Sequence, residues 1–246
     1  MTDTRRPSLS IVIPAYNEAG RLGVSLGQVR DYAAASRKAI EVIVVDDGST
    51  DATAELVERF DPGTLSVRLL SNAVNMGKGH SVRRGVLDAS GQAVLMTDAD
   101  LSTPITEVDK LLGWLDDGFA VVIGSRRMPE TVLGATRAWY RHMMQGAFQF
   151  LRRRMILRDI RDTQCGFKCF RRDAAMAIFA QQRTDGWAFD CEVLALARRL
   201  GYRVKEVGVV WCEDPDSRLR PVRDSVGMLI SLVRIRRRMR RFTPPA

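Results

Sequence analysis

Short apolar runs rich in Val, Ile and Leu recur along the first half of the chain, separated by stretches with helical periodicity. The runs occupy residues 9–13, 41–45, 67–70, 93–96 and 121–123. Between the first two, Leu22, Leu26 and Val29 recur at the spacing of one helix face. Apolar strands that alternate with helices are typical of a mostly parallel sheet covered by helices on both faces. The pattern therefore predicts an α/β, Rossmann-like fold.

Polar loops follow three of the predicted strands, at residues 14–18, 46–51 and 97–103. The carboxyl ends of parallel strands meet at one edge of a sheet, and ligands bind there. Asp98 and Asp100 place two carboxylates at this edge, where they can hold a divalent cation that neutralises a diphosphate. A solvated turn is the alternative, because Asp also favours turns. The chain has no glycine-rich dinucleotide fingerprint or Walker loop, which disfavours dinucleotide-dependent oxidoreductases and P-loop NTPases.

The C-terminal residues predict a basic amphipathic helix. Its apolar positions, spaced four and three apart, form one narrow stripe: Met228, Leu232, Ile235, Met239 and Phe242. The arginines between 234 and 241 lie off this stripe. Such a helix fits the surface of an anionic membrane; a docked terminal helix, an oligomer contact and a nucleic-acid arm are the alternatives. In the basic segment 139–157, a core-packing helix is slightly favoured over a membrane-facing one.

The composition narrows the partners and the compartment. The formal net charge of +9 indicates anionic partners such as nucleotide diphosphates, phospholipid head groups or nucleic acid. No apolar segment is long enough to cross a bilayer, and the N-terminus lacks a signal peptide. We therefore expect a cytoplasmic protein that is peripheral on the inner face of the membrane. The cysteines are too scattered for a disulfide framework or a zinc site, so free thiols are expected.

Several motifs follow one another along residues 8–220. They are 11–18 (IVIPAYNE), 44–51 (VVDDGSTD), 75–79 (NMGKG), 97–100 (TDAD), 124–126 (GSR), 161–168 (RDTQCGFK) and 186–192 (GWAFDCE). In this order they resemble family 2 glycosyltransferases of the GT-A fold, particularly the polyprenyl-phosphate sugar synthases and their dolichyl-phosphate glucosyltransferase branch. The predicted division is a tail at 1–7, a GT-A domain at 8–221 and the basic helix at 222–246. Within the domain, the nucleotide-binding half ends at about residue 125 and the acceptor half covers 126–221.

The resemblance implies a nucleotide-sugar site at the predicted sheet edge. Its residues would be Pro14, Ala15, Tyr16, Glu18, Asp46, Asp47, Lys78, Asp98, Ala99 and Asp100. Asp98 and Asp100 would contact Mg²⁺ or Mn²⁺, with Ser102 as a further metal ligand. Related mannosyl-transferring enzymes often carry Gln near the position of Ser102, so the third protein ligand is left open.

The resemblance also implies catalytic roles for Asp100, Asp190 and Arg126. The acceptor phosphate would meet Arg126, Ser217 and Arg218, together with either Arg137 or Arg141, and the sequence leaves the choice between these two arginines open. A lipid phosphate is already anionic at neutral pH and needs no general base, in which case Asp190 positions the donor sugar. If the acceptor is a sugar hydroxyl instead, Asp190 must act as the base.

The predicted activity is the inverting, metal-dependent transfer of a hexose, glucose being the first choice, from a UDP-sugar to a polyprenyl or dolichyl monophosphate. The protein would reach its lipid through amphipathic helices on an anionic membrane surface or through a separate membrane-protein partner. A family 2 transferase with a soluble or glycan acceptor is the first alternative. A nucleic-acid-binding protein is a distant one, because it leaves the acidic loops without a role, and nucleic acid is not an expected partner.

Overall fold

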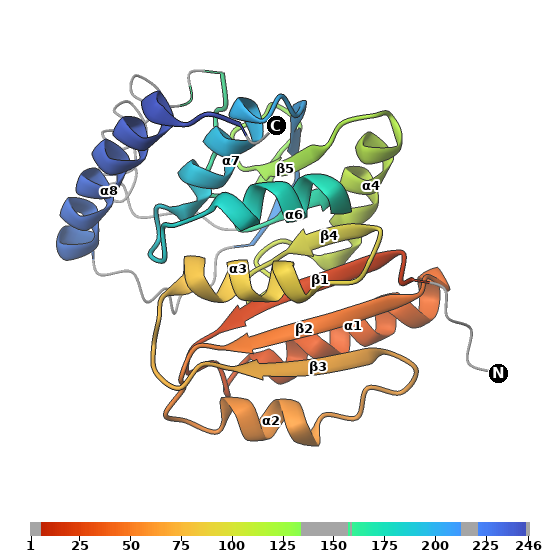
Figure 1. Cartoon of the computed structure of the whole chain (residues 1–246). Coiled ribbons are helices and arrows are strands. Elements are labelled where there is room, and N and C mark those ends of the chain that lie inside the picture. Colours follow the sequence, from red (N-terminus) through yellow and green to blue (C-terminus); the bar gives the residue numbers. More distant parts are fainter. Residues whose placement is uncertain (1–5, 134–156, 158, 213–220, 245–246) are drawn as a thin grey trace.

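A central sheet lies between two layers of helices (Figure 1). The computed structural model describes residues 6–133, 157, 159–212 and 221–244. The sheet contains β1 (Leu9–Ala15), β2 (Ile40–Asp46), β3 (Ser66–Ser71), β4 (Ala93–Met96), β5 (Val121–Ser125), β7 (Lys168–Arg171) and β8 (Val204–Gly208). A separate small sheet pairs β6 (Val132–Leu133) with β9 (Val210–Trp211). Every apolar run predicted as a strand is a strand, and the α/β class is confirmed.

The helices cover both faces of the sheet. They are α1 (Leu22–Ser36), α2 (Thr53–Arg59), α3 (Lys78–Asp88), α4 (Val108–Asp116), α6 (Arg172–Gln181), α7 (Phe189–Arg199) and α8 (Pro221–Arg241), with a 3₁₀ turn at Ile105–Glu107. One core cluster joins α1, α2 and α4 to one face, and the other joins α3, α6 and α7 to the opposite face. The central strands are apolar throughout because both of their faces are covered.

The strand order is β3-β2-β1-β4-β7-β5-β8. All neighbouring pairs in this sheet are parallel except the two that involve β7. The parallel strands β1, β2, β4 and β5 therefore end at one edge, as the sequence predicts. Strands from the two predicted halves of the domain alternate in one sheet, and each of the two core clusters contains residues from both halves.

Strand β7 lies between β4 and β5 and runs antiparallel to both. Its first residue, Lys168, pairs in register with Met96 of β4 and Ile123 of β5. Because the direction is reversed, β7 begins where its neighbours end. The segment that precedes β7 is thereby brought to the same edge as the loops after β1, β2 and β4.

Helix α3 packs very closely on the sheet. At Gly85, an added Cβ would lie 2.5 Å from the Val12 side chain and 2.9 Å from the Val45 side chain. Glycine is the residue that allows this approach of helix to strands. The close packing holds the helix that begins with Lys78 against the strands whose ends form the predicted site.

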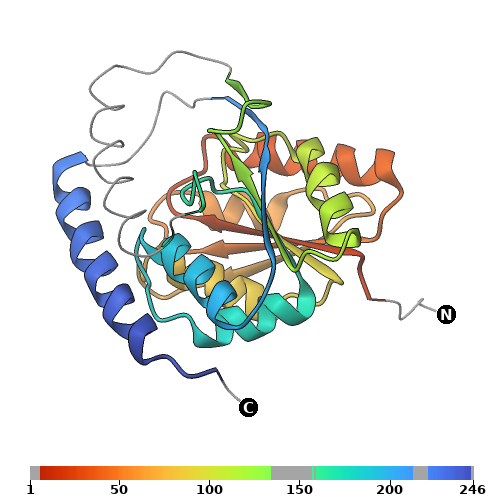
Figure 2. The ribbon, with the colours of Figure 1, turned by 90° about the horizontal axis from the view of Figure 1, so that it is seen from above.

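The apolar stripe of the C-terminal helix packs against the protein. Leu232, Ile235 and Met239 are buried in the core cluster that contains α7, and Figure 2 shows α8 on the outer side of α7. The prediction that this stripe faces a membrane is therefore wrong, and the alternative of a docked terminal helix holds. Helical periodicity identifies an apolar face, but it does not say whether protein or lipid covers that face.

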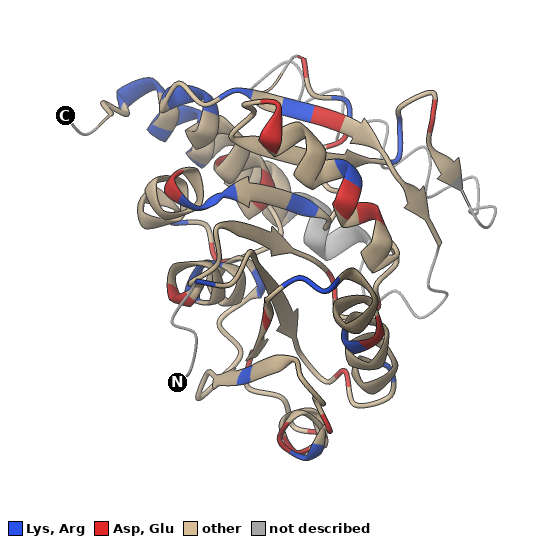
Figure 3. Ribbon diagram, turned by 90° about the vertical axis from the view of Figure 1, so that its right-hand side faces the viewer, with Lys and Arg blue, Asp and Glu red and all other residues tan. Residues whose placement is uncertain are grey.

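The other side of α8 is exposed. It carries the apolar residues Leu229 and Ile230, followed by Arg234, Arg236, Arg237, Arg240 and Arg241. In Figure 3 the basic positions run along α8 toward the C-terminus. We call these seven residues the outer face of α8.

None of the helices in the described part of the chain has both the length and the apolar character that a bilayer-spanning segment needs. Four predicted acceptor-phosphate residues lie outside the described residues: Arg137, Arg141, Ser217 and Arg218. The predicted helix at 139–157 also lies outside them, apart from Leu157, which is buried.

Candidate active site

The turn after β4 carries the two predicted metal ligands, Asp98 and Asp100. Leu101 adopts a φ of 45°, and its N–H donates a hydrogen bond to the carbonyl of Asp98 at 3.2 Å. Ala99 is buried, and its carbonyl accepts a hydrogen bond from the Ser25 hydroxyl of α1 at 2.7 Å. Ala99 therefore anchors the turn to α1, while the Asp98 side chain stays 37% exposed.

Ser102 supports Asp100. Its N–H donates to Oδ1 of Asp100 at 2.9 Å, and its carbonyl accepts the N–H of Cys212 at 2.8 Å. These bonds hold the Asp100 carboxylate in place. The role of Ser102 as a metal ligand stays a prediction.

Lys78, the first residue of α3, forms an ion pair with Asp98. Burial by itself would lower the pKa of Lys78, but the charges of Asp98 and Asp190 outweigh burial and raise the pKa. Likewise, burial would raise the pKa of Asp98, but Lys78 holds that pKa below its usual value. Both groups are therefore charged at neutral pH. The Lys78 ammonium also lies 5.1 Å from the centre of the Trp187 ring, within cation–π range.

Asp100 shows the opposite shift. Burial is the main cause that raises its pKa, and the negative charge of Asp98 adds to it. A divalent cation would relieve the repulsion between these carboxylates, so the residues present fit a Mg²⁺ or Mn²⁺ site. Within the part of the chain that the structure describes, no group of three His, Cys, Asp or Glu side chains is placed to hold a metal. The other ligands would be phosphate oxygens and water, as is common for Mg²⁺.

Gly166 lies directly against the Asp98 carboxylate. A Cβ at position 166 would lie only 2.1 Å from Oδ2 and 2.5 Å from Cγ of Asp98. Glycine is needed here because the backbone before β7 approaches Asp98 so closely. The segment before β7 thus forms one wall of the acidic turn.

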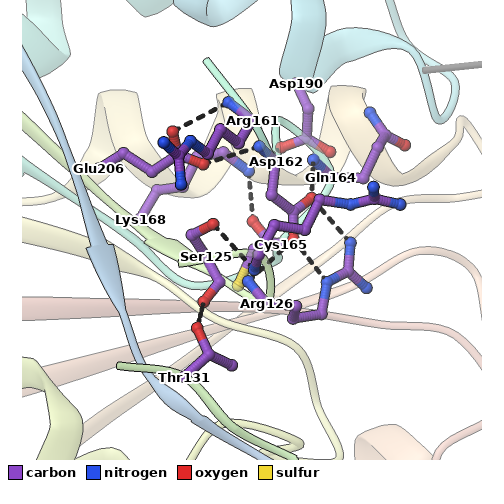
Figure 4. A network of polar contacts seen from close by, with 11 residues as sticks. Ser125, Arg126, Thr131, Arg161, Asp162, Gln164, Cys165, Lys168, Asp190 and Glu206 are labelled. Carbon is purple, nitrogen blue, oxygen red and sulfur yellow. Dashed lines mark hydrogen bonds and ion pairs between the residues drawn. The ribbon is translucent and has the colours of Figure 1, made fainter. Parts of the chain in front are cut away.

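A fully buried ion pair joins Lys168 of β7 to Asp190 of α7 (Figure 4). Lys168 also donates a hydrogen bond to the carbonyl of Cys165. Burial has the largest influence on Asp190 and raises its pKa, while the charges of Lys168 and Lys78 act in the opposite direction. The predicted catalytic carboxylate is thus held in place and partnered by a lysine.

Arg126 and the buried Asp162 form a two-point ion pair (Figure 4). The Nε–Oδ2 distance is 2.7 Å and the Nη2–Oδ1 distance is 2.9 Å. Burial would raise the pKa of Asp162, but Arg126 and the N–H groups of Arg126 and Gln164 lower it far below its usual range. Arg126 lies at the predicted edge of the sheet, and its Nε and Nη2 groups both donate to Asp162. Its contact with a phosphate stays a prediction.

The predicted nucleotide pocket lies at the ends of β1 and β2. Tyr16, 40% exposed, follows β1, whose last residues Pro14 and Ala15 pair with β2. Glu18 forms an ion pair with Arg21. Asp46, the last residue of β2, accepts the Ser49 N–H at 3.2 Å and also the Ser49 hydroxyl.

Asp47 has a structural role that its place after a predicted strand does not indicate. Its carboxylate accepts the side-chain amide of Asn72 at 2.7 Å and the N–H groups of Met76 and Gly77 at 2.9 and 2.8 Å. Asp47 is buried. Asp47 therefore holds the loop that leads to Lys78. Its contact with the nucleotide stays a prediction.

The site contains residues that the sequence reasoning did not single out, namely Asp162, Gly166 and Lys168. All three lie in the motif at 161–168, which indicates the family by its place among the other motifs but does not show the role of each residue. Asp162 and Lys168 lie in a motif that leads into an apolar strand, which indicates that both are buried. Buried charges require partners, so this position could have identified them as members of ion pairs. Glu192 pairs with an arginine, Arg238.

Known proteins resemble this chain in sequence. The sequence profile of the glycosyl transferase family 2 matches residues 10–179. The dolichyl-phosphate beta-glucosyltransferase of Drosophila melanogaster is 39% identical over 236 residues, which cover 90% of this chain and 72% of that protein. The human dolichyl-phosphate beta-glucosyltransferase is 36% identical over 232 residues, covering 89% of this chain and 72% of that protein.

Solved structures share the fold at lower identity. Glucosyl-3-phosphoglycerate synthase from Mycobacterium tuberculosis, in complex with Mn²⁺ and UDP-glucose, matches with a TM-score of 0.68 and 20% identity over 94% of this chain and 79% of that chain. The mannosyltransferase PcManGT from Pyrobaculum calidifontis, in complex with GDP-Man and Mn²⁺, matches with a TM-score of 0.66 and 23% identity over 98% of this chain and 67% of that chain.

The structural likeness identifies the fold as GT-A, with the acidic turn at the edge where the ordered motifs predicted the donor site. The sequence matches extend over most of the chain. The chain therefore belongs to the glycosyl transferase family 2, and the protein is a glycosyltransferase.

Proposed function

We propose that the protein transfers glucose from UDP-glucose to a polyprenyl phosphate such as dolichyl phosphate. The observation that carries the proposal is the group formed by Asp98, Asp100 and Lys78 beside a lysine-paired Asp190. The relatives named dolichyl-phosphate beta-glucosyltransferases support the choice of donor sugar and acceptor. The arrangement of Asp98, Asp100 and Lys78 supports the type of reaction, which is sugar transfer with loss of a nucleoside diphosphate.

The donor diphosphate would lie at the acidic turn. Asp98 and Asp100 would hold a divalent metal, Mg²⁺ or Mn²⁺, and this metal would neutralise the diphosphate when bound. Lys78 adds a cation beside the leaving group, which stabilises the charge that develops there. Tyr16 and Asp46, at the ends of β1 and β2, are proposed to contact the base and ribose.

The acceptor is proposed to be a phosphate because Asp190 is poorly placed to act as a base. It is buried and bound to Lys168. A phosphate monoester has a second pKa of about 6 and is already anionic at neutral pH, so its attack requires no proton removal. One phosphate oxygen bonds to the anomeric carbon, the bond from that carbon to the diphosphate breaks, and the configuration inverts. Asp190 and Lys168 then position the donor sugar.

The outer face of α8 is proposed to lie on an anionic membrane surface. It takes the role that the sequence analysis gave to the apolar stripe of this helix. Leu229 and Ile230 would enter the head-group region, and the arginines beyond them would contact lipid phosphates. This arrangement would bring the lipid acceptor to the protein on the cytoplasmic face.

The test is a turnover assay with purified protein, Mg²⁺ or Mn²⁺, a panel of UDP- and GDP-sugars, and polyprenyl phosphate in detergent. We expect lipid-linked glucose from UDP-glucose alone. EDTA and Asp100→Asn should each reduce turnover by about a hundredfold or more, because a bound metal supplies several kcal/mol of stabilisation. Asp190→Asn should reduce it less than the ~10²–10⁴-fold typical of a lost general base. Transfer only to hydroxyl acceptors, abolished by Asp190→Asn, would overturn the proposal and make Asp190 the base.

A further inference from the structure

The carboxylate of Glu192 connects three parts of the chain near the site. Glu192 lies in the first turn of α7 and is only 1% exposed. It accepts the N–H groups of Arg183 and Thr184 at 3.0 and 2.7 Å and forms an ion pair with Arg238 of α8. Arg238 also donates a hydrogen bond to the carbonyl of Gln181 at the end of α6. The C-terminal helix is thereby tied to the segment 182–187, which lies between α6 and α7.

The segment 182–187 in turn holds the beginning of α3. The carbonyl of Asp185 accepts the N–H groups of Gly79 and His80 at 2.6 and 3.2 Å, and the side-chain amide of Gln182 donates to the Gly79 carbonyl at 2.9 Å. A Cβ at Gly77 would lie 2.6 Å from the Asp185 carbonyl oxygen. The two backbones are therefore in direct contact, with no side chain between them.

Lys78 lies between Gly77 and Gly79 and forms the ion pair with Asp98. Trp187, at the end of the segment, lies within 5.1 Å of the Lys78 ammonium. A continuous series of contacts thus extends from Arg238 through Glu192 and the segment 182–187 to Lys78 and Asp98. Removing Arg238 would leave Glu192 buried without its cation, which is strongly unfavourable, and the segment would have to rearrange.

We propose that Arg238 and Glu192 are positioning residues for the donor site. The docking of the C-terminal helix through this pair sets the position of Lys78 and, through it, of Asp98. The inference rests on the proposed function, in which Lys78 and Asp98 meet the donor diphosphate. Misplacement of a binding group by about 1 Å can cost about a hundredfold in rate, so a small shift of the segment is enough to impair the site.

The experiment compares Arg238→Ala, Arg238→Lys and Glu192→Gln with the wild-type full chain. UDP-glucose affinity in the presence of Mn²⁺ is measured by calorimetry, and KM is measured for donor and acceptor in detergent. We expect Arg238→Ala and Glu192→Gln to raise the donor Kd and KM by about tenfold, with the acceptor KM within about twofold of wild type. Arg238→Lys keeps the positive charge, but a single ammonium does not reproduce the separate contacts of the guanidinium with Glu192 and the Gln181 carbonyl. We therefore expect a donor affinity between those of wild type and Arg238→Ala.

Arg198→Ala is the matched control. Arg198 also pairs a helix with an acid, since it lies on α7 and contacts Asp159 at 2.7 Å, but this pair is on the surface. Arg198→Ala should leave donor binding unchanged. Variants of Arg238 and Glu192 that lower the melting temperature while keeping the wild-type donor KM would show a purely structural pair and overturn the inference. If Arg238→Ala does not fold, Arg238→Lys and Glu192→Gln decide by the same criterion. Wild-type protein that fails to bind UDP-glucose would refute the proposed function instead.

Discussion

At the scale of single residues, the candidate site is a set of paired charges. Lys78 pairs with Asp98, Lys168 with Asp190, and Arg126 with Asp162. Each pair brings together residues far apart in the sequence, and each buried member would be costly without its partner. Burial and the like charge of Asp98 raise the pKa of Asp100, and a bound cation would relieve that repulsion. The pairs keep the site rigid, and this carboxylate supplies a place for a cation.

The Arg126–Asp162 pair predicts a pH-dependent contribution to stability. Asp162 has a lowered pKa in the folded protein, so its stabilising effect is complete above the pKa of the unfolded chain, about 3.9. The effect decreases as pH falls below that value toward the folded pKa. At pH 7, Asp162→Asn should reduce the free energy of unfolding by about 3–5 kcal/mol, because Arg126 is left without its partner.

Urea unfolding of wild type and Asp162→Asn between pH 7 and pH 3 measures this contribution. The difference in unfolding free energy between the two proteins should be constant near neutral pH and should shrink at the acidic end. A difference that stays the same down to pH 3 would mean that Asp162 does not owe its stabilising effect to its charge.

At the scale of elements, strand β7 assembles the site. It enters the sheet between β4 and β5 in the opposite direction, so Lys168 and the residues before it reach the edge where Asp98 lies. Without the reversal, β7 would begin at the opposite edge of the sheet. The antiparallel strand therefore explains how the motif at 161–168 takes part in a site otherwise built from loops after parallel strands.

Gly166→Ala tests this assembly. The added methyl group would lie 2.1 Å from Oδ2 of Asp98, so the Asp98 carboxylate must shift from its position in the acidic turn. We expect the affinity for Mn²⁺ with UDP-glucose, measured by calorimetry, to fall by about ten- to a hundredfold, the range seen when the surroundings of metal ligands are disturbed.

Gly113→Ala provides the control, because a Cβ at Gly113 of α4 has no neighbouring atom within 4 Å. It should bind donor and metal as the wild type does and should be slightly more stable, since Ala is the better helix former. Wild-type metal affinity in a folded Gly166→Ala protein would argue against the close packing of this segment on Asp98.

At the scale of the whole molecule, the C-terminal helix has two faces, one apolar and one mostly basic. The stripe with Leu232, Ile235 and Met239 belongs to the core, and the outer face of α8 belongs to the surface. Five arginines lie on that outer face, and they contribute to the net charge of +9. The molecule thus combines a docked helix with a surface suited to anionic lipid.

Substitutions on the two sides of α8 should separate these roles. Leu229→Asp with Ile230→Asp should abolish co-sedimentation with anionic vesicles and leave the melting temperature unchanged, because both residues are exposed. Leu232→Asp should destabilise the protein by about 3 kcal/mol or more, because it buries a charged group. Vesicle binding that survives the double substitution would assign the membrane contact to another surface.

The amino-acid sequence determined the features that depend on local chemistry. Apolar runs specified strands β1 to β5, helical spacing specified α1, and the ordered motifs led to Asp98 and Asp100 at the edge where the parallel strands end. These features could be predicted because side-chain alternation, helical period and turn preference are properties of neighbouring residues.

The tertiary structure decided which groups meet. It paired Lys168 with Asp190, used Asp47 to hold the loop before Lys78, placed β7 between β4 and β5, and turned the stripe of α8 inward. The sequence contains all these residues. It does not show which opposite charge each charged residue pairs with, or whether protein or lipid covers an apolar helix face. Only the folded chain brings distant segments together, and it is there that the cost of burying a charge or exposing an apolar face determines each partner.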